Sequence, residues 1–258
     1  MKKLLALLLC LTMIVAAFTL TSCKKKDKEE AEKTFETLNG KTAEELYNEA
    51  LAKLQGLDNF ETVTTQVITM KIEGQKIDMN QVVITKKAGQ NVYTKSTNDM
   101  ESSVDMEVWY VDEWLYAKTF GQSFKANISY EQMEEEFMPE GANADGALLQ
   151  IPESWFKDIA FRQSGSEYYI EFIVSGDEYL EYLSSAAGIG QYLNGIDDVS
   201  YKVYFTSDGE LRDIVTEFKM DVQGVKCDVE SVSVVKNVGS TTITAPEGTF
   251  ADYTEYYK

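Results

Sequence analysis

Between Phe60 and Lys118 the character of the side chains alternates residue by residue, and this alternation restricts the fold more than any other feature. A period of two residues is typical of β-strands, in which successive side chains point to opposite faces. The alternating segments are Phe60–Ile72, Ile77–Thr85, Asn91–Thr97, Val104–Tyr110 and Trp114–Lys118. Because only short turns join them, the sequence predicts an antiparallel meander of five strands.

Strand patterns return near the end of the chain. The segments Tyr168–Val174, Val199–Phe205, Leu211–Val222 and Val225–Val235 carry them. Asp208-Gly209 lies between two of these segments, and this dipeptide is a strong hairpin signal. Met70–Met79 also aligns weakly with Met220–Val229, which leaves open a duplication or a shared turn chemistry. We therefore expect one antiparallel sheet of about eight to ten strands in an α+β fold.

The clearest predicted helix runs from Thr42 to Leu57. Thr42-Ala43-Glu44-Glu45 has the pattern of a capping box, and Gly56 can end the helix in the left-handed conformation. Its single apolar stripe predicts that the helix lies on the concave face of the sheet. Further helical segments are expected at Tyr130–Phe137, at Pro152 and at Tyr179–Ala187, the last opened by Ser175-Gly176-Asp177-Glu178.

The N-terminus has the pattern of a bacterial lipoprotein signal peptide. Two lysines precede an apolar run from Leu4 to Leu20, and Leu20-Thr21-Ser22-Cys23 matches a lipobox. An uncleaved membrane anchor is the alternative, although the run of 17 residues is shorter than the roughly 20 that a spanning helix needs. The expected division is a signal peptide at 1–22, a flexible lipidated tether at 23–41 and one globular domain at 42–258.

Lipidation at Cys23 would hold the protein on the outer, extracytoplasmic face of the cell membrane, since two acyl chains anchor stably. The lysines that follow Cys23 can approach an anionic surface or simply form a solvated tether. Removal of Lys2 and Lys3 leaves 22 basic residues against 43 acidic ones, a net charge of −21. Such a charge argues against nucleic acid as a partner, because phosphate binding requires a basic surface.

The common catalytic constellations are missing from the sequence. The chain has no histidine, so Ser-His-Asp triads, Cys-His pairs and histidine zinc sites cannot form. Asp197/Asp198 and the Glu134–Glu136 run are expected by chance in so acidic a chain, and Asn143–Gly146 is an incomplete calcium loop. Cys227 is interpreted as a buried hydrophobic residue. We therefore expect neither an enzyme nor a resident cofactor or metal.

Aromatic residues crowd one predicted hairpin and one later segment. They either fill a solid core or line an apolar cavity between sheet and helices. Alternation sends Trp109 and Tyr110 to opposite faces, so only one of them points inward, whereas Trp114 and Tyr116 share a face. The candidate ligand-binding residues are Trp109, Trp114, Tyr116, Trp155 and Phe156.

The chain also resembles a known superfamily, the LolA-like and LppX-like lipoprotein carriers and lipid-binding lipoproteins, and is similar to uncharacterised lipoproteins of Gram-positive bacteria. The motifs that carry the resemblance are Thr42–Tyr47, Leu54–Leu57, Val108–Tyr116, Val203–Leu211 and Ile243–Gly248. The resemblance implies an unclosed β half-barrel that wraps helices around a cavity for acyl chains. A lipid or other apolar ligand is then expected. The alternative is a surface interaction module with a packed core, whose protein partner the sequence does not identify.

Overall fold

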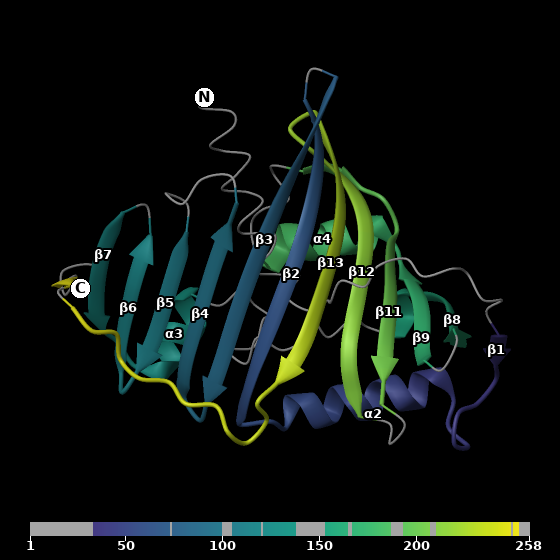
Figure 1. Ribbon diagram of the computed structural model, residues 1–258, viewed down its shortest axis with the longest axis horizontal. Helices are drawn as coiled ribbons and strands as arrows, with labels where there is room; N and C mark the ends of the chain where they lie inside the picture. The colour runs from purple at the N-terminus through teal and green to yellow at the C-terminus, as the bar shows by residue number, and fades with distance from the viewer. Residues whose placement is uncertain are drawn as a thin grey trace.

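A computed structural model describes residues 33–72, 74–99, 105–119, 121–137, 153–164, 167–186, 193–206, 210–248 and 250–252. The strands are β1 (Lys33–Phe35), β2 (Asn59–Ile72), β3 (Gln75–Ala88), β4 (Asn91–Asn98), β5 (Met106–Val111), β6 (Trp114–Thr119), β7 (Gln122–Asn127), β8 (Phe156–Ser164), β9 (Glu167–Val174), β10 (Leu193–Ile196), β11 (Val199–Phe205), β12 (Leu211–Val222), β13 (Val225–Lys236) and β14 (Ala251–Asp252). All of them belong to one sheet (Figure 1).

The strands follow the spatial order β1-β8-β9-β11-β12-β13-β2-β3-β4-β5-β6-β7-β14, and β10 pairs with β12 beside this path. Neighbouring strands are antiparallel except β7 and β14, which are parallel. The predicted single, unclosed antiparallel sheet is therefore confirmed. In the described part of the chain it holds fourteen strands rather than eight to ten. The edge strands β1 and β14, of three and two residues, are too short to show a period in the sequence.

Two long hairpins, β2–β3 and β12–β13, form the centre of the sheet. Each turns through a glycine with positive φ, 81° at Gly74 and 87° at Gly224, where a residue with a side chain would be strained. These hairpins contain the two weakly repeated segments. They lie side by side through the pairing of β13 with β2.

Helix α2 (Ala43–Gln55) begins at the predicted capping box. The Thr42 hydroxyl accepts a hydrogen bond from the Glu45 amide at 3.2 Å, and the Glu45 carboxylate accepts one from the Thr42 amide at 2.9 Å. The expectation for its end is wrong. Gly56 has φ −79° because its N–H bonds the Ala52 carbonyl and continues the right-handed turn.

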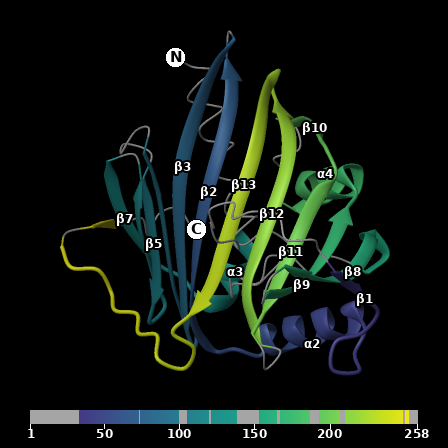
Figure 2. The same cartoon turned by 45° about the vertical axis from the view of Figure 1, so that its right-hand side comes forward.

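The other helices are α3 (Tyr130–Phe137), the short turn η2 (Glu153–Trp155) and α4 (Gly176–Ala186). A capping box also precedes α3, formed by Ser129 and Gln132. The Ser129 hydroxyl accepts a hydrogen bond from the Gln132 backbone N–H, and the Gln132 side-chain oxygen accepts one from the Ser129 backbone N–H. The helices lie on one side of the sheet, which curves around them, while the C-terminal segment crosses the opposite side (Figures 1 and 2). We call these sides the concave and convex faces.

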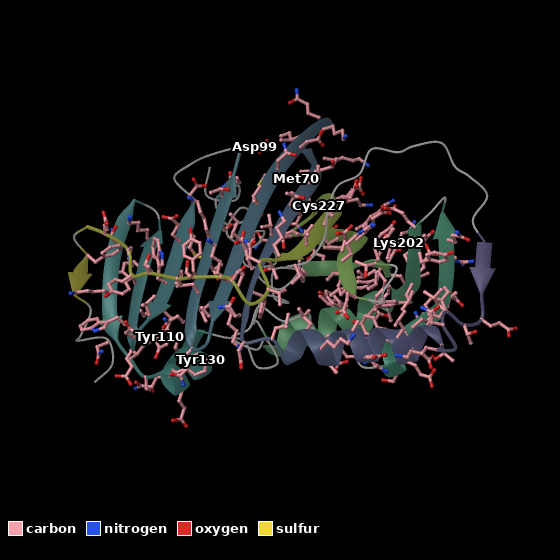
Figure 3. All side chains as sticks on the ribbon, turned by 60° about the horizontal axis from the view of Figure 1, so that its bottom comes forward. Met70, Asp99, Tyr110, Tyr130, Lys202 and Cys227 are labelled. Carbon is pink, nitrogen blue, oxygen red and sulfur yellow. The ribbon has the colours of Figure 1, made fainter. Side chains whose placement is uncertain are left out.

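Two separate apolar clusters fill the concave side. The larger one joins the buried stripe of α2 to α4 and to strands β8, β9 and β11–β13, and extends onto β2 and β3, where it reaches Val83, opposite Thr64, near the middle of β3. The smaller one lies under α3 on strands β4–β7. In this smaller cluster, the Tyr110 hydroxyl donates to the Ile128 carbonyl at 3.3 Å, and the Tyr110 and Tyr130 rings lie 5.7 Å apart (Figure 3). The core is thus divided along the sheet.

The sheet begins before the globular domain was expected to begin. Strand β1 lies within the 23–41 stretch and pairs with β8, where Phe35 is opposite Phe161. The predicted signal segment 1–22 and Cys23 lie outside the described residues. In the part of the chain that is described, none of the helices combines the length and the apolar character needed to span a membrane.

Candidate functional site

Buried polar side chains cross the concave face between the two apolar clusters. We call this group the polar band. Its members are 5% exposed or less and come from the five adjacent central strands β12, β13, β2, β3 and β4: Thr62, Thr64, Gln66, Gln81, Thr85, Ser96, Thr216, Ser231 and Ser233. On β2 they alternate with half-buried Val63, Thr65 and Val67, which face the convex side.

The strand register brings the members of the polar band together. Gln66 is directly opposite Gln81, two positions along from the opposed pair Ile68 and Met79, which belong to the larger apolar cluster. Directly opposed residues of an antiparallel pair share a face. The polar band therefore adjoins the larger apolar cluster on the side of Ile68 and Met79.

Hydrogen bonds satisfy only part of the polar band. The hydroxyl oxygens of Thr64 and Ser233 lie 2.6 Å apart, and the Gln81 amide nitrogen donates to the Ser96 hydroxyl at 2.8 Å. Both amide atoms of Gln66 and the amide oxygen of Gln81 have no hydrogen-bond partner among the described residues. Buried polar groups are normally paired, so an orphaned glutamine amide in a cluster of hydroxyls marks a candidate ligand site.

The polar band contains no ionisable side chain. The nearest buried cation on the same face of β3 is Lys87, which is opposite Phe60 at the far end of the strand. Its ammonium nitrogen lies 3.9 Å from a carboxylate oxygen of Asp58. The site therefore offers neutral donors and acceptors rather than charge.

Three of the five candidate residues predicted from sequence lie on the convex face. Tyr110 points inward at 3% exposure, so Trp109 points outward, as strand alternation required. Trp109, Trp114, Tyr116 and Tyr93 are half-buried there, and we call them, with Phe250, the aromatic patch. Phe250 packs edge-on against Trp109 at 6.4 Å and Tyr116 at 5.5 Å.

A partly exposed ion pair lies beside Tyr93 of the aromatic patch. The Tyr93 hydroxyl donates to Glu107 at 3.1 Å, and Lys95 lies 2.9 Å from the same carboxylate. Burial, followed by the Glu107 charge, raises the pKa of Tyr93. Burial opposes ionisation of Glu107, but hydrogen bonds from Lys95 and Tyr93 outweigh it and lower the pKa of that carboxyl. The negative charge of Glu107 beside the aromatic patch is thus balanced by Lys95.

The other two candidates, Trp155 and Phe156, lie on the concave side at the opposite end of the sheet. Phe156 packs against Phe172 at 4.5 Å and Tyr47 of α2 at 5.3 Å, and Trp155 is half-buried against the same cluster. The structure therefore does not bring the five candidates into one wall. Sequence alternation separates the two faces of a strand, but it does not tell which face the helices cover.

A depression of about 530 Å³ opens on the convex face over β8, β9 and β11. Ile159 and Ile173 line it together with Asp158, Arg162 and Glu171, and the Arg162 guanidinium lies 3.1 Å from the Glu171 carboxylate. Its charged side chains already form an ion pair, and it lies on the face opposite to the helices. It is therefore not the predicted apolar cavity.

Of the remaining sequence candidates, Cys227 and Asp198 have structural contacts. Cys227 is 1% exposed within the larger cluster, and burial, with the charges of Asp221 and Asp228, raises its pKa to about 12. Asp198 accepts a hydrogen bond from the Gly176 amide at the start of α4. Glu134–Glu136 fall within α3, and Asn143–Gly146 lie outside the described residues. The described part of the chain contains no cluster of three or more acidic or cysteine side chains that could hold a metal.

Comparison with known proteins returns a family and several solved structures. The model of a family of unknown function, DUF6612, matches residues 42–191. No curated protein sequence matches the chain. The chain is similar to the lipoprotein LppX of Mycobacterium tuberculosis at 8% identity and a TM-score of 0.41, which covers 78% of this chain and 96% of that one.

Two further structures are similar at a TM-score of 0.29 and 11% identity. A LolA-superfamily protein of Nitrosomonas europaea covers 80% of this chain and 96% of its own. A putative outer membrane lipoprotein-sorting protein domain of Vibrio parahaemolyticus covers 78% and 95%. LppX and the LolA superfamily are the groups that the sequence resembles.

Proposed function

This chain belongs to the DUF6612 family, whose function is unknown, and we propose that it is a membrane-anchored extracytoplasmic lipoprotein that binds a lipid or other apolar ligand on the concave side of its sheet. The lipobox-like sequence Leu20–Cys23 supports the anchor. The binding role is favoured over an enzymatic one because the sequence lacks histidine and its acidic candidate Asp198 caps a helix.

The observation that carries the binding role is the division of the concave face. One unclosed sheet has two separate apolar clusters, the larger under α2 and α4 and the smaller under α3. The central strands β2–β4 between them carry buried side chains whose hydrogen bonds to the described residues are incomplete. An apolar chain placed along this face would contact apolar side chains of the cluster that adjoins the polar band.

Lipid binding is tested first on purified protein. The chain from residue 23 onward, with Cys23→Ser so that no anchor is attached, is expected to carry co-purified lipid in native mass spectrometry. After delipidation it should bind a fluorescent fatty-acid ester saturably at micromolar concentration. Absence of both co-purified lipid and saturable ester binding would refute the proposed lipid-binding function.

The anchor has its own test. Cys23→Ala is expected to abolish incorporation of a clickable fatty acid during growth and to leave the signal peptide uncleaved. The wild-type chain provides the control. Equal labelling of the two proteins would refute lipidation at Cys23.

A second candidate function is a surface interaction module, and the aromatic patch favours it. Lysine side chains lie over its rings, with Lys118 at 5.6 Å from Trp109 and Lys125 at 4.9 Å from Trp114. Half-buried tryptophan and tyrosine beside cations are typical of contact surfaces. This candidate would be preferred if the lipid experiments failed while the protein remained folded.

A further inference from the structure

We infer that the polar band binds the uncharged, hydrogen-bonding group of an amphiphilic ligand, such as the hydroxyls of an acylglycerol or a primary amide. This inference rests on the proposed lipid-binding function and adds the chemical class of the ligand. It is argued from the unpaired glutamine amide, from the neutral character of the band and from the apolar surface beside it.

The first observation is Gln66. Its side chain is buried at 2% exposure, yet neither its amide nitrogen nor its amide oxygen has a partner among the described residues. A glutamine amide can donate two hydrogen bonds and accept two. Burial removes its water, and no described residue replaces those hydrogen bonds, which is unfavourable. A ligand group that both donates and accepts would replace those lost bonds.

The surrounding groups extend the same chemistry. The Gln81 amide oxygen, directly opposite Gln66, is also unpaired within the described part of the chain. Thr64 and Ser233 share one hydrogen bond, so one hydroxyl of the pair keeps a proton free for a further acceptor. Several donors and acceptors therefore converge on one region of the concave face.

Charge selects the class of head group. No member of the polar band is ionisable, and Lys87 is six residues from Gln81 along β3, or about 20 Å at the rise of a strand. A phosphate or carboxylate bound at Gln66 would be buried without a counter-ion, and such burial is strongly unfavourable. An uncharged group carries no such penalty.

The hydrocarbon part of the ligand has a defined direction. Ile68 and Met79 lie one side-chain repeat from Gln66 and Gln81 on the same face and belong to the larger apolar cluster. A ligand whose head group contacts Gln66 would therefore extend its chain over Ile68 and Met79 toward the Gly74 turn, away from the Asn59 end of β2 that follows α2. This places the boundary between polar and apolar parts of the ligand beside Ile68.

The test uses four ligands with the same oleoyl chain: monooleoylglycerol, oleamide, methyl oleate and oleate at pH 8. Binding is compared by native mass spectrometry on the chain from residue 23 with Cys23→Ser. We expect the first two to bind at least about tenfold more tightly than methyl oleate and oleate. Gln66→Met should weaken those two about tenfold, change methyl oleate less than twofold, and leave the melting temperature of the ligand-free protein unchanged or higher.

The control variant is Thr65→Val, the adjacent residue on the convex face of β2, which should bind all four ligands like the wild type. A wild-type protein that binds methyl oleate without preferring the uncharged head groups would overturn this inference and leave the proposed function in place. Equal weakening of every ligand by Gln66→Met, with a lower melting temperature, would assign the residue a structural role. Failure of all four ligands to bind would overturn both.

Discussion

Replacement of Gly176 by alanine is expected to destabilise the protein, although the same change normally stabilises a helix end. A glycine-to-alanine change restricts the unfolded chain and adds about 0.4–1 kcal/mol of stability where space permits. At Gly176 an added Cβ would lie 2.1 Å from the Ile196 carbonyl oxygen and 2.7 Å from the Asp197 carbonyl carbon and oxygen. These are backbone atoms, so no side-chain rotation relieves the overlap.

The magnitude follows from what must move. Carbon–oxygen contacts below about 3.3 Å are repulsive, so α4 and the β10–β11 connection must separate by about 1 Å. This separation weakens two hydrogen bonds. The Gly176 backbone N–H donates to the Asp198 carboxylate at 3.1 Å, and the Asp197 backbone N–H donates to the Lys219 carbonyl at 2.8 Å. Each is worth about 1 kcal/mol, and displaced packing costs about 1–3 kcal/mol. The net loss is about 2–4 kcal/mol after the gain in the unfolded chain is subtracted.

Urea unfolding, followed by tryptophan fluorescence, measures this loss. With a slope of about 2 kcal/mol per molar urea, the Gly176→Ala midpoint should fall by about 1–2 M. Gly195→Ala is the matched control, because a Cβ added on β10 meets no described atom within 4 Å. Its midpoint should stay within about 0.5 M of the wild type. A Gly176→Ala midpoint equal to that of the control would show that the start of α4 is not packed against the β10–β11 connection.

Two further predictions concern the convex face and the free thiol. Phe250→Ala removes edge contacts to Trp109 and Tyr116, so it should cost about 2–3 kcal/mol and shift tryptophan emission to longer wavelength; unchanged emission would contradict the packing of the C-terminal segment. With Cys23→Ser, Cys227 is the only thiol of the chain from residue 23, and its reaction with iodoacetamide at pH 8 should be at least about 100-fold slower than in denaturant. Burial raises the pKa of the Cys227 thiol from 9.0 to about 12, so the contribution of the neutral thiol to stability is complete below pH 9 and is lost as the pH rises toward 12. Rapid labelling of the folded protein by iodoacetamide would contradict the burial of Cys227.

Local signals in the sequence predicted much of the fold. The Thr42 capping box and the period of two residues depend on neighbours along the chain, so they identified α2 and the hairpins of the sheet. The edge strand β1 was missed because three residues carry no period. The prediction that the helix ends in the left-handed conformation at Gly56 was wrong, because one more backbone hydrogen bond continues the right-handed turn.

The candidate site was harder to predict, for a physical reason. On β2 the inward side holds Thr64 and Gln66, whereas the convex side holds Val63 and Val67, so hydropathy does not identify the buried face. One signal could have indicated the buried face of β2. Gln66 is two residues from Ile68, so both side chains point to the same face, and Ile68 is buried in the larger cluster. The partner strand β13 comes from a distant part of the chain, so no local pattern could indicate the polar band.

The two shortest strands of the sheet are also its borders: β1 has three residues and β14 has two. Exposed strand borders invite pairing between molecules, and the hazard grows when proteins are confined to a surface at high local density. Among the described residues, borders this short cover only part of the strands behind them: β1 pairs with Phe161–Gln163 of β8, and β14 with Phe124 and Lys125 of β7. For a protein held on a membrane as proposed, resistance to self-association would then depend on these two small strands, and removal of β14 should increase self-association.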